Sequence, residues 1–182
     1  LRAVMEAAPN AKVAFNWLAK ARIDDHWDIP MDRVFFLNPG QSLRTADREL
    51  VTVRPPIFDS PASLGIYDSA TGTFFGGDSF GSIIPEPVEN VADVSQQAYE
   101  DGFRLFNSLL SPWTQLVDQQ KFDATIEAVA RFKPKTILSG HGPTAEGMSD
   151  QLMQLMSTIP QVEPFVGPDQ AAVEAILAQF EA

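Results

Sequence analysis

One of the chain's two histidines stands between two glycines, directly after a short apolar segment, in the string SGHGP at residues 139–143. Residues 136–138 are Thr, Ile and Leu, the β-branched and aliphatic residues of a buried strand, so His141 stands where a predicted strand ends. Glycine on both sides lets the backbone bend sharply and approach a ligand closely. The pattern suits a metal ligand, and the alternative is a turn histidine that only ends a strand.

An aspartate occupies a similar position in the string GGDSFG at residues 76–81. Residues 64–68 alternate apolar side chains and are joined to residues 73–75 by a short loop that contains glycine, which predicts a β-hairpin. Asp78 therefore follows the second strand of the hairpin. As a metal ligand it would supply carboxylate oxygens, and the alternative is an Asx-turn in which the carboxylate binds nearby backbone N–H groups.

A second aspartate, Asp59, lies in the string VRPPIFDSP at residues 53–61. The three prolines of this string force an extended path with few backbone hydrogen bonds, so Asp59 is expected on a rigid loop after a strand. Asp59, Asp78 and His141 are thus three polar residues on three loops, each expected to follow a strand. We expect their side chains to converge within roughly 3 to 6 Å of one another if they share metal ions.

These three residues resemble the second half of the ligand set of the metallo-β-lactamase fold, and most closely its flavodiiron and oxygen-binding diiron branch. The strings FDSPASLGIYD, GGDSFG and SGHGP carry the resemblance, which covers about residues 1–145. It implies an α/β (α+β) fold, an αββα sandwich. It also implies two metal ions, with Asp78 bridging them and His141 bound to one.

The sequence departs from this family at two places. Asp59 stands where the family usually has a histidine, an exchange that favours harder metal ions because the new donor is oxygen. The family's first metal motif, HxHxDH or HxExDH, should precede the string PNAKV, which stands at residues 9–13. Residues 1–8 of this sequence do not contain that motif. We therefore expect an N-terminally truncated single domain over residues 1–182, with weakened metal binding and a helical tail at 159–182.

The composition excludes several classes of function and partner. The chain has 182 residues, is 45% hydrophobic, and has 13 basic against 24 acidic residues, a net charge of −11. This charge argues against nucleic acid as a partner, and no apolar run is long enough to cross a membrane. The chain has no cysteine, so disulfides and thiolate ligands are excluded. We expect a cytoplasmic protein.

Apolar periodicity and turn residues predict helices that alternate with strands before and after the hairpin. Tyr99, Phe103, Phe106 and Leu110 recur at helical spacing, and Asn16 is placed to cap a helix that begins at Trp17. The further expected strands are 12–15, 33–37, 48–53 and 136–138, and the further helices are 1–8, 121–132, 148–158 and 168–180.

Several other residues have a structural interpretation that is preferred to a functional one. His26 lies in an acidic loop that is typical of a solvated surface. Tyr99 and Glu100 suit an amphipathic helix, although they could support a metal site from behind. The tryptophans are expected to pack rather than to stack on a cofactor: Trp17, Trp27 and Trp113.

The metal determines the chemistry that the site would support. With iron, the favoured ion, the resemblance implies an oxidoreductase that binds or reduces dioxygen or nitric oxide and receives electrons from a separate donor. With zinc or manganese, the same residues would serve a hydrolase of esters or phosphodiesters that uses a metal-activated water. A non-catalytic metal-binding or sensor module is the third hypothesis.

Exposed sheet edges left by missing strands would favour association into homo-oligomers.

Overall fold

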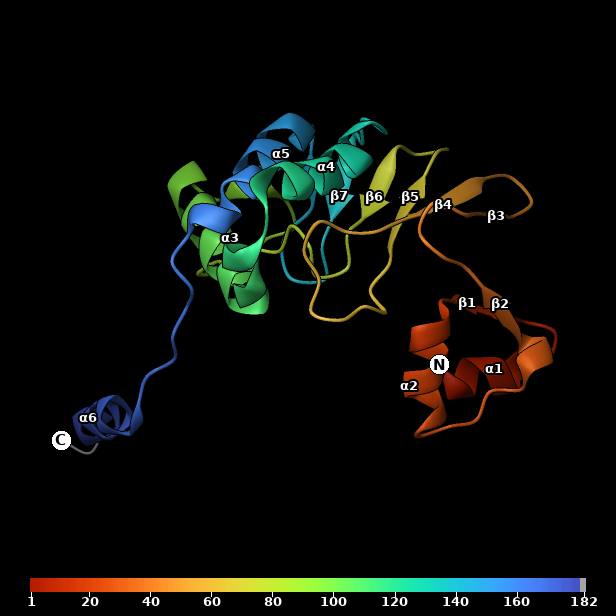
Figure 1. Ribbon diagram of the computed structural model, residues 1–182, viewed down its shortest axis with the longest axis horizontal. Coiled ribbons are helices and arrows are strands. Elements are labelled where there is room, and N and C mark those ends of the chain that lie inside the picture. The colour runs from red at the N-terminus through yellow and green to blue at the C-terminus, as the bar shows by residue number, and fades with distance from the viewer. Residues whose placement is uncertain (181–182) are drawn as a thin grey trace.

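The computed structural model describes residues 1–180, which form a six-stranded sheet with its helices, a smaller two-stranded unit, and a separate final helix (Figure 1). The larger sheet has the strand order β3-β4-β5-β6-β7-β8, and β1 pairs with β2 in the smaller one. The elements in chain order are α1 (Arg2–Ala7), β1 (Val13–Phe15), α2 (Trp17–Asp24), η1 (Met31–Arg33), β2 (Val34–Phe36), β3 (Ser42–Arg44), β4 (Glu49–Val53), β5 (Gly65–Asp68), β6 (Thr73–Phe75), η2 (Val91–Asp93), α3 (Gln96–Leu110), η3 (Pro112–Leu116), α4 (Gln119–Ala130), β7 (Thr136–Leu138), β8 (Ala145–Glu146), α5 (Ser149–Ser157), η4 (Ile159–Gln161) and α6 (Gln170–Phe180).

The hairpin predicted from the sequence is confirmed: β5 and β6 are antiparallel. Its loop is organised by the buried carboxylate of Asp68, which accepts hydrogen bonds from the Ala70 amide at 2.9 Å, the Thr71 hydroxyl at 3.1 Å and Arg48 at 2.9 Å. Burial raises the pKa of Asp68, but these three donors outweigh it and hold the pKa below its ordinary value. Gly72 closes the loop at φ +73°, a conformation that glycine adopts without strain.

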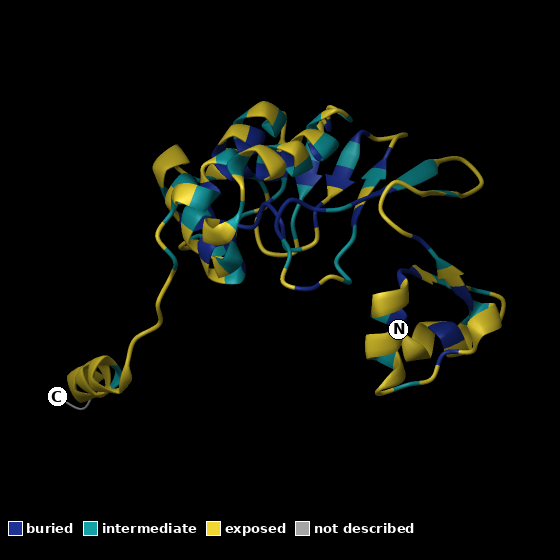
Figure 2. Ribbon diagram, in the orientation of Figure 1, coloured by how far each residue is buried: buried dark blue, intermediate teal, exposed yellow. Residues whose placement is uncertain are grey.

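Helices α3, α4 and α5 cover one face of the larger sheet. Successive strand residues point to opposite faces, so Phe74 of β6 is fully buried beneath these helices while Phe75 is 45% exposed on the other face. Figure 2 shows the buried residues concentrated between the sheet and these helices. The sheet and all three helices contribute buried side chains to this core, among them Phe74, Ile137, Phe103, Phe122, Val129, Leu152 and Met156.

The smaller unit has its own core, in which Met5, Phe15, Ile29 and Val34 pack together. The predicted cap of α2 is confirmed, since the Asn16 side chain accepts a hydrogen bond from the Ala19 amide at 2.9 Å. A cavity of about 300 Å³ lies between this unit and the larger sheet, lined by residues of β1, β3, β4 and β5. Two sheets that carry helices agree with the α+β class and the αββα arrangement expected from the sequence.

Helix α6 stands apart from the rest of the chain at the end of an irregular segment, residues 162–169 (Figure 1). None of its residues is buried. It begins at Gln170, two residues later than expected, because Asp169 caps it through the Ala172 amide at 2.9 Å. Residues 181–182 of the expected helical tail lie outside the described residues, and the single domain over 1–182 stays a prediction.

Strands β3 and β8 were not expected from the sequence, since Ser42–Arg44 contains a single apolar residue and Ala145–Glu146 is only two residues long. Helix α4 begins at Gln119, two residues before its expected start, with Asp118 as its cap. Within residues 1–180, every helix is too short or too polar for a bilayer crossing.

Candidate metal centre

Asp78 and His141 lie side by side at one edge of the larger sheet. Strands β6 and β7 are parallel neighbours, with Phe75 opposite Leu138, so the loops that follow them leave the sheet at the same edge. Nε2 of His141 is 3.0 Å from Oδ1 of Asp78. The His141 side chain is 54% exposed and that of Asp78 34%, so both reach solvent. The two residues, each expected to follow a strand, are therefore in direct contact.

Backbone hydrogen bonds join the two loops along their length. The Gly76 amide donates to Leu138 O at 2.8 Å and the Gly140 amide to Gly77 O at 2.7 Å. The Ser82 amide then donates to the carbonyl of His141 at 2.8 Å. Because these bonds fix both backbones, the separation of the two side chains depends on little more than their own rotamers.

Helix α3 supports both loops from one side. The ring of Phe106 packs against the imidazole of His141 with centroids 5.0 Å apart and planes inclined by 36°. The next residue, Asn107, is fully buried and donates from Nδ2 to Gly81 O at 3.0 Å, on the loop that carries Asp78. Its Oδ1 has no hydrogen-bond partner within the described residues. Two consecutive residues of α3 therefore hold the two candidate ligands.

The close approach of α3 depends on a residue without a side chain. A Cβ added at Gly102 would lie 1.8 Å from the carbonyl oxygen of Ile83 and 2.8 Å from Oγ of Ser82. The Ile83 amide in turn donates to Gly102 O at 3.2 Å. Gly102 thus lets the helix backbone touch the segment that follows the Asp78 loop.

An open pocket of about 420 Å³ adjoins His141. Most of its lining is apolar, and Ser82 and His141 contribute the polar side chains. The lining consists of Ser82, Ile83, Ile84, Pro87, Val88, Phe106, His141, Gly142 and Pro143. A small uncharged molecule could therefore reach the imidazole ring through an apolar entrance.

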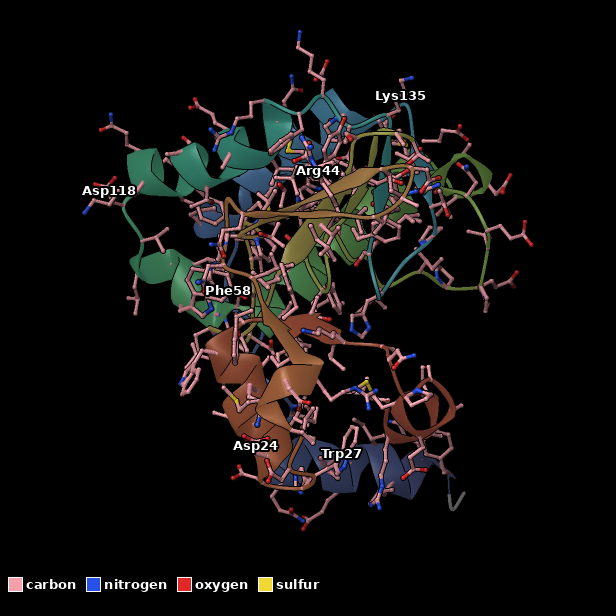
Figure 3. All side chains as sticks on the ribbon, turned by 90° about the vertical axis from the view of Figure 1, so that its right-hand side faces the viewer. Asp24, Trp27, Arg44, Phe58, Asp118 and Lys135 are labelled. Carbon is pink, nitrogen blue, oxygen red and sulfur yellow. The ribbon has the colours of Figure 1, made fainter. Side chains whose placement is uncertain are left out.

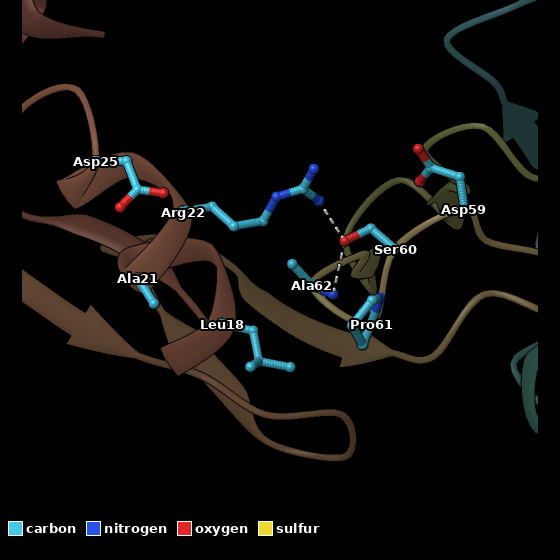
Figure 4. A pocket seen from close by; sticks show the side chains of 8 residues that line it. All are labelled: Leu18, Ala21, Arg22, Asp25, Asp59, Ser60, Pro61 and Ala62. Carbon is cyan, nitrogen blue, oxygen red and sulfur yellow. Dashed lines mark hydrogen bonds between the residues drawn. The ribbon is translucent and has the colours of Figure 1, made fainter.

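Asp59 is not part of this arrangement. Its exposed side chain lines a different pocket, of about 620 Å³, between α2 and the proline-rich loop (Figure 4). That loop is held toward α2 by Arg22, whose Nη1 donates to Oγ of Ser60 at 2.6 Å. Residues 1–180 contain no group of three His, Cys, Asp or Glu side chains that could hold a metal ion. The expected convergence of all three candidates is therefore not found, and ligation by any of them stays a prediction.

The other residues weighed from the sequence lie away from this edge or have packing roles. His26 is exposed beyond the end of α2. Tyr99 is 2% exposed in the main core, and burial raises its pKa to about 12. A hydrogen bond from Gln96 lowers the pKa of Glu100, with help from Arg104 and against a contribution from burial. Trp113 packs on Phe58 with ring centroids 5.3 Å apart.

Sequence reasoning missed three residues that shape the site. Phe106 was identified only as part of an apolar helical stripe, and Asn107 interrupts that stripe without any local signal of its contact with Gly81. Ser139 binds the backbone of the other loop, because its hydroxyl donates to Gly77 O at 3.2 Å. The polar Asn107 on the buried side of a strongly amphipathic helix was the one available clue.

Comparison with known proteins identifies the fold. No protein-family model and no curated protein matches the sequence. Rubredoxin oxygen:oxidoreductase from the anaerobe Desulfovibrio gigas matches in structure with a TM-score of 0.72 at 18% identity, over 88% of this chain and 39% of that one. The flavodiiron protein from Giardia intestinalis matches with a TM-score of 0.67 at 15% identity, over 84% and 37%. The chemotaxis sensor ODP, solved as a peroxy diiron species, matches with a TM-score of 0.65 at 16% identity, over 91% and 65%.

This chain has the metallo-β-lactamase-like fold of the flavodiiron proteins. The resemblance expected from the three sequence strings is thereby confirmed at the level of fold. The chain spans less than half the length of the first two of these proteins and about two thirds of the third. At such low identity the likeness concerns the fold alone.

Proposed function

We propose that Asp78 and His141 bind metal together, as part of a dinuclear site whose favoured ion is iron, in a protein that binds or reduces dioxygen or nitric oxide. The observation that carries this proposal is the 3.0 Å contact between Nε2 of His141 and Oδ1 of Asp78 on two loops joined by backbone hydrogen bonds. The structural likeness to rubredoxin oxygen:oxidoreductase, to a flavodiiron protein and to a sensor with a diiron species supports the choice of iron.

The donor set fits a metal in type but is short in number. A carboxylate can bridge two ions through its two oxygens, and a neutral imidazole is a good ligand for iron, zinc and manganese. Protein metal sites commonly use about three or four side-chain ligands, whereas residues 1–180 bring only Asp78 and His141 together here. Further donors are needed, and Asp59 lies in the lining of a separate pocket beside α2.

When bound, iron would supply the redox chemistry toward dioxygen or nitric oxide, with electrons from a separate donor. The chain's own residues orient the site and control access to it. Phe106 restricts the rotation of the His141 ring. The apolar lining of the adjoining pocket admits small uncharged molecules in preference to ions. Protons compete with metal for His141, because only the neutral imidazole can bind a metal ion.

One observation favours a second candidate, a non-catalytic metal-binding or sensor module. Asp59 stands where the resembling family has a histidine, and it lies by Arg22 and Ser60 in a pocket of its own (Figure 4). A site that lacks this donor would hold metal weakly. The hydrolase with zinc or manganese uses the same two residues and differs only in the ion.

Metal titration of the purified chain under anaerobic conditions tests the proposal. Iron, manganese and zinc are added in turn, and bound metal is measured after desalting. Asp78→Ala should abolish binding, since it removes the carboxylate that both ions would share, and His141→Ala should reduce it. The chain has only two histidines, so His26→Ala is a matched control that should bind as the parent does.

Oxygen consumption by the iron-loaded chain with a chemical reductant then separates the candidates. Consumption that His141→Ala lowers supports the oxidoreductase, and stable iron binding without turnover supports the sensor. Ester or phosphodiester cleavage by the zinc or manganese form supports the hydrolase. If the parent binds none of the three ions, the metal site proposed here is wrong.

A further inference from the structure

One peptide group of the loop that carries Asp78 is hydrogen-bonded at both ends. The carbonyl oxygen of Gly81 accepts from Nδ2 of Asn107 at 3.0 Å. The amide of Ser82 donates to the carbonyl of His141 at 2.8 Å. The Gly81 carbonyl and the Ser82 amide belong to the same planar peptide unit, so the two hydrogen bonds lie on opposite sides of one rigid group. A side chain of α3 is thereby connected to the backbone of a candidate ligand.

The orientation of the Asn107 side-chain amide follows from its neighbours. Nδ2 also donates to the carbonyl of Phe103 at 2.7 Å. Both neighbouring groups are carbonyl oxygens, which only accept, so the NH₂ group of Asn107 must face them. Its Oδ1 has no hydrogen-bond partner among residues 1–180. A fully buried side chain with an acceptor that no other protein group satisfies is unusual.

The hydrogen bond to Gly81 is the one that reaches outside α3. The carbonyl of Phe103 lies one turn before Asn107 and is already a backbone acceptor of the helix, so Nδ2 adds little there. Side chains crowd the space between the larger sheet and its helices (Figure 3). At Gly81 itself, an added Cβ would lie 2.5 Å from Cε1 of Phe106 and 3.0 Å from the carbonyl oxygen of His141. The loop and the helix therefore meet closely at this peptide.

We propose that Asn107 is a positioning residue of the metal centre, an inference that rests on the proposed metal site. It holds the peptide between Gly81 and Ser82, and this peptide holds the backbone of His141 in the position that metal binding requires. Core packing alone would favour leucine, which fills a similar volume without burying an unsatisfied oxygen. Leucine, however, would leave the Gly81 carbonyl without its donor and let the peptide rotate.

Asn107→Leu tests this role, because it keeps the volume of the side chain and removes the donor. Zn²⁺ or Fe²⁺, each alone, is titrated into the parent and the variant under anaerobic conditions, and bound metal is measured at each step. The affinity should fall about 10- to 100-fold, the usual effect of losing a group that orients a ligand. Ser108→Ala is the matched control and should bind as the parent does, since the hydrogen bond from its buried hydroxyl, to Leu105 O at 3.0 Å, stays within α3.

A second control separates positioning from general stability. Leu152 is fully buried in α5 and takes no part in the hydrogen bonds between α3 and the two loops. Leu152→Ala should therefore lose stability in denaturant unfolding and keep the metal affinity of the parent.

Amide hydrogen exchange of the metal-free protein, followed by NMR, tests the connection through the peptide without any metal. In Asn107→Leu the Ser82 amide should exchange at least ~10-fold faster than in the parent, because its hydrogen bond to His141 opens more often. The amide of Ile137, in the neighbouring strand β7, should exchange as in the parent.

Parent-like metal affinity in Asn107→Leu overturns the proposal, whatever happens to the exchange of Ser82. An equal loss of affinity in Leu152→Ala also overturns it, because the effect would then follow from stability alone. Unchanged exchange at Ser82 would show that the peptide does not connect Asn107 to His141. A parent that binds neither ion overturns the proposed metal site itself, and the first titration reveals this before any variant is compared.

Discussion

Replacing Gly102 by alanine should destabilise this protein, although the same change inside a helix ordinarily stabilises. Gly102 lies in the middle of α3, where alanine is favoured over glycine by about 1 kcal/mol. Here, however, the added Cβ would lie 1.8 Å from the carbonyl oxygen of Ile83. A backbone oxygen cannot rotate out of the way as a side chain can, so either α3 or the segment at residues 82–83 must move.

The balance of these two effects gives the size of the change. Ordinary van der Waals contact begins at about 3.4 Å, so the overlap with Ile83 is large and the cost lies at or above the usual upper value of about 3 kcal/mol for overpacking. Subtracting the gain in helix propensity leaves a loss of at least about 2 kcal/mol in the free energy of unfolding. For a chain of this size the melting temperature should fall by about 4 to 8 °C.

Thermal unfolding followed by circular dichroism measures this change, with Asp101→Ala, an exposed neighbour on α3, as the control that should differ little from the parent. The same displacement should weaken metal binding, because Ser82, adjacent to Ile83, donates its amide to the carbonyl of His141 at 2.8 Å. A Gly102→Ala protein that melts at or above the parent temperature would refute the reasoning, because it would mean that α3 does not approach Ile83 so closely.

Three further predictions concern α3 and the core. The pKa of Tyr99 is raised to about 12 from an ordinary 10.0, so its contribution to stability is complete below pH 10 and is lost as pH rises toward 12. Tyr99→Phe should therefore lose less stability than the parent over this pH range. An identical alkaline unfolding curve for both proteins would contradict this. Phe106→Ala should lower metal affinity by releasing the His141 ring, measured by titration, and unchanged affinity would show that the ring contact is incidental. Leu152→Ala, at a fully buried site, should cost about 2 to 5 kcal/mol in denaturant unfolding, and a loss below about 1 kcal/mol would mean that the core there is loosely packed.

The sequence alone determined the local features of the candidate site. Alternation in the residues of β5, the aromatic run of β6 and the glycine-containing loop between them predicted the hairpin, because side chains of a strand point alternately to its two faces. Glycine-flanked polar residues after two apolar runs placed Asp78 and His141 at strand ends. Asn16 was recognised as a cap because capping involves residues only three positions apart.

Contacts between distant segments were decided by the tertiary structure. Parallel pairing of β6 with β7 brings Asp78 and His141 to 3.0 Å, although sixty-two residues separate them in the sequence, and no local pattern encodes which strands pair. Asp59 has the right chemical type for a ligand but lines a separate pocket beside α2, and the sequence around it gives no sign of where its loop lies. The roles of Gly102 and Asn107 depend on how closely α3 approaches another segment. Periodicity and capping are set by neighbours within one or two turns of chain, whereas strand order, loop direction and helix approach depend on packing among side chains far apart in sequence.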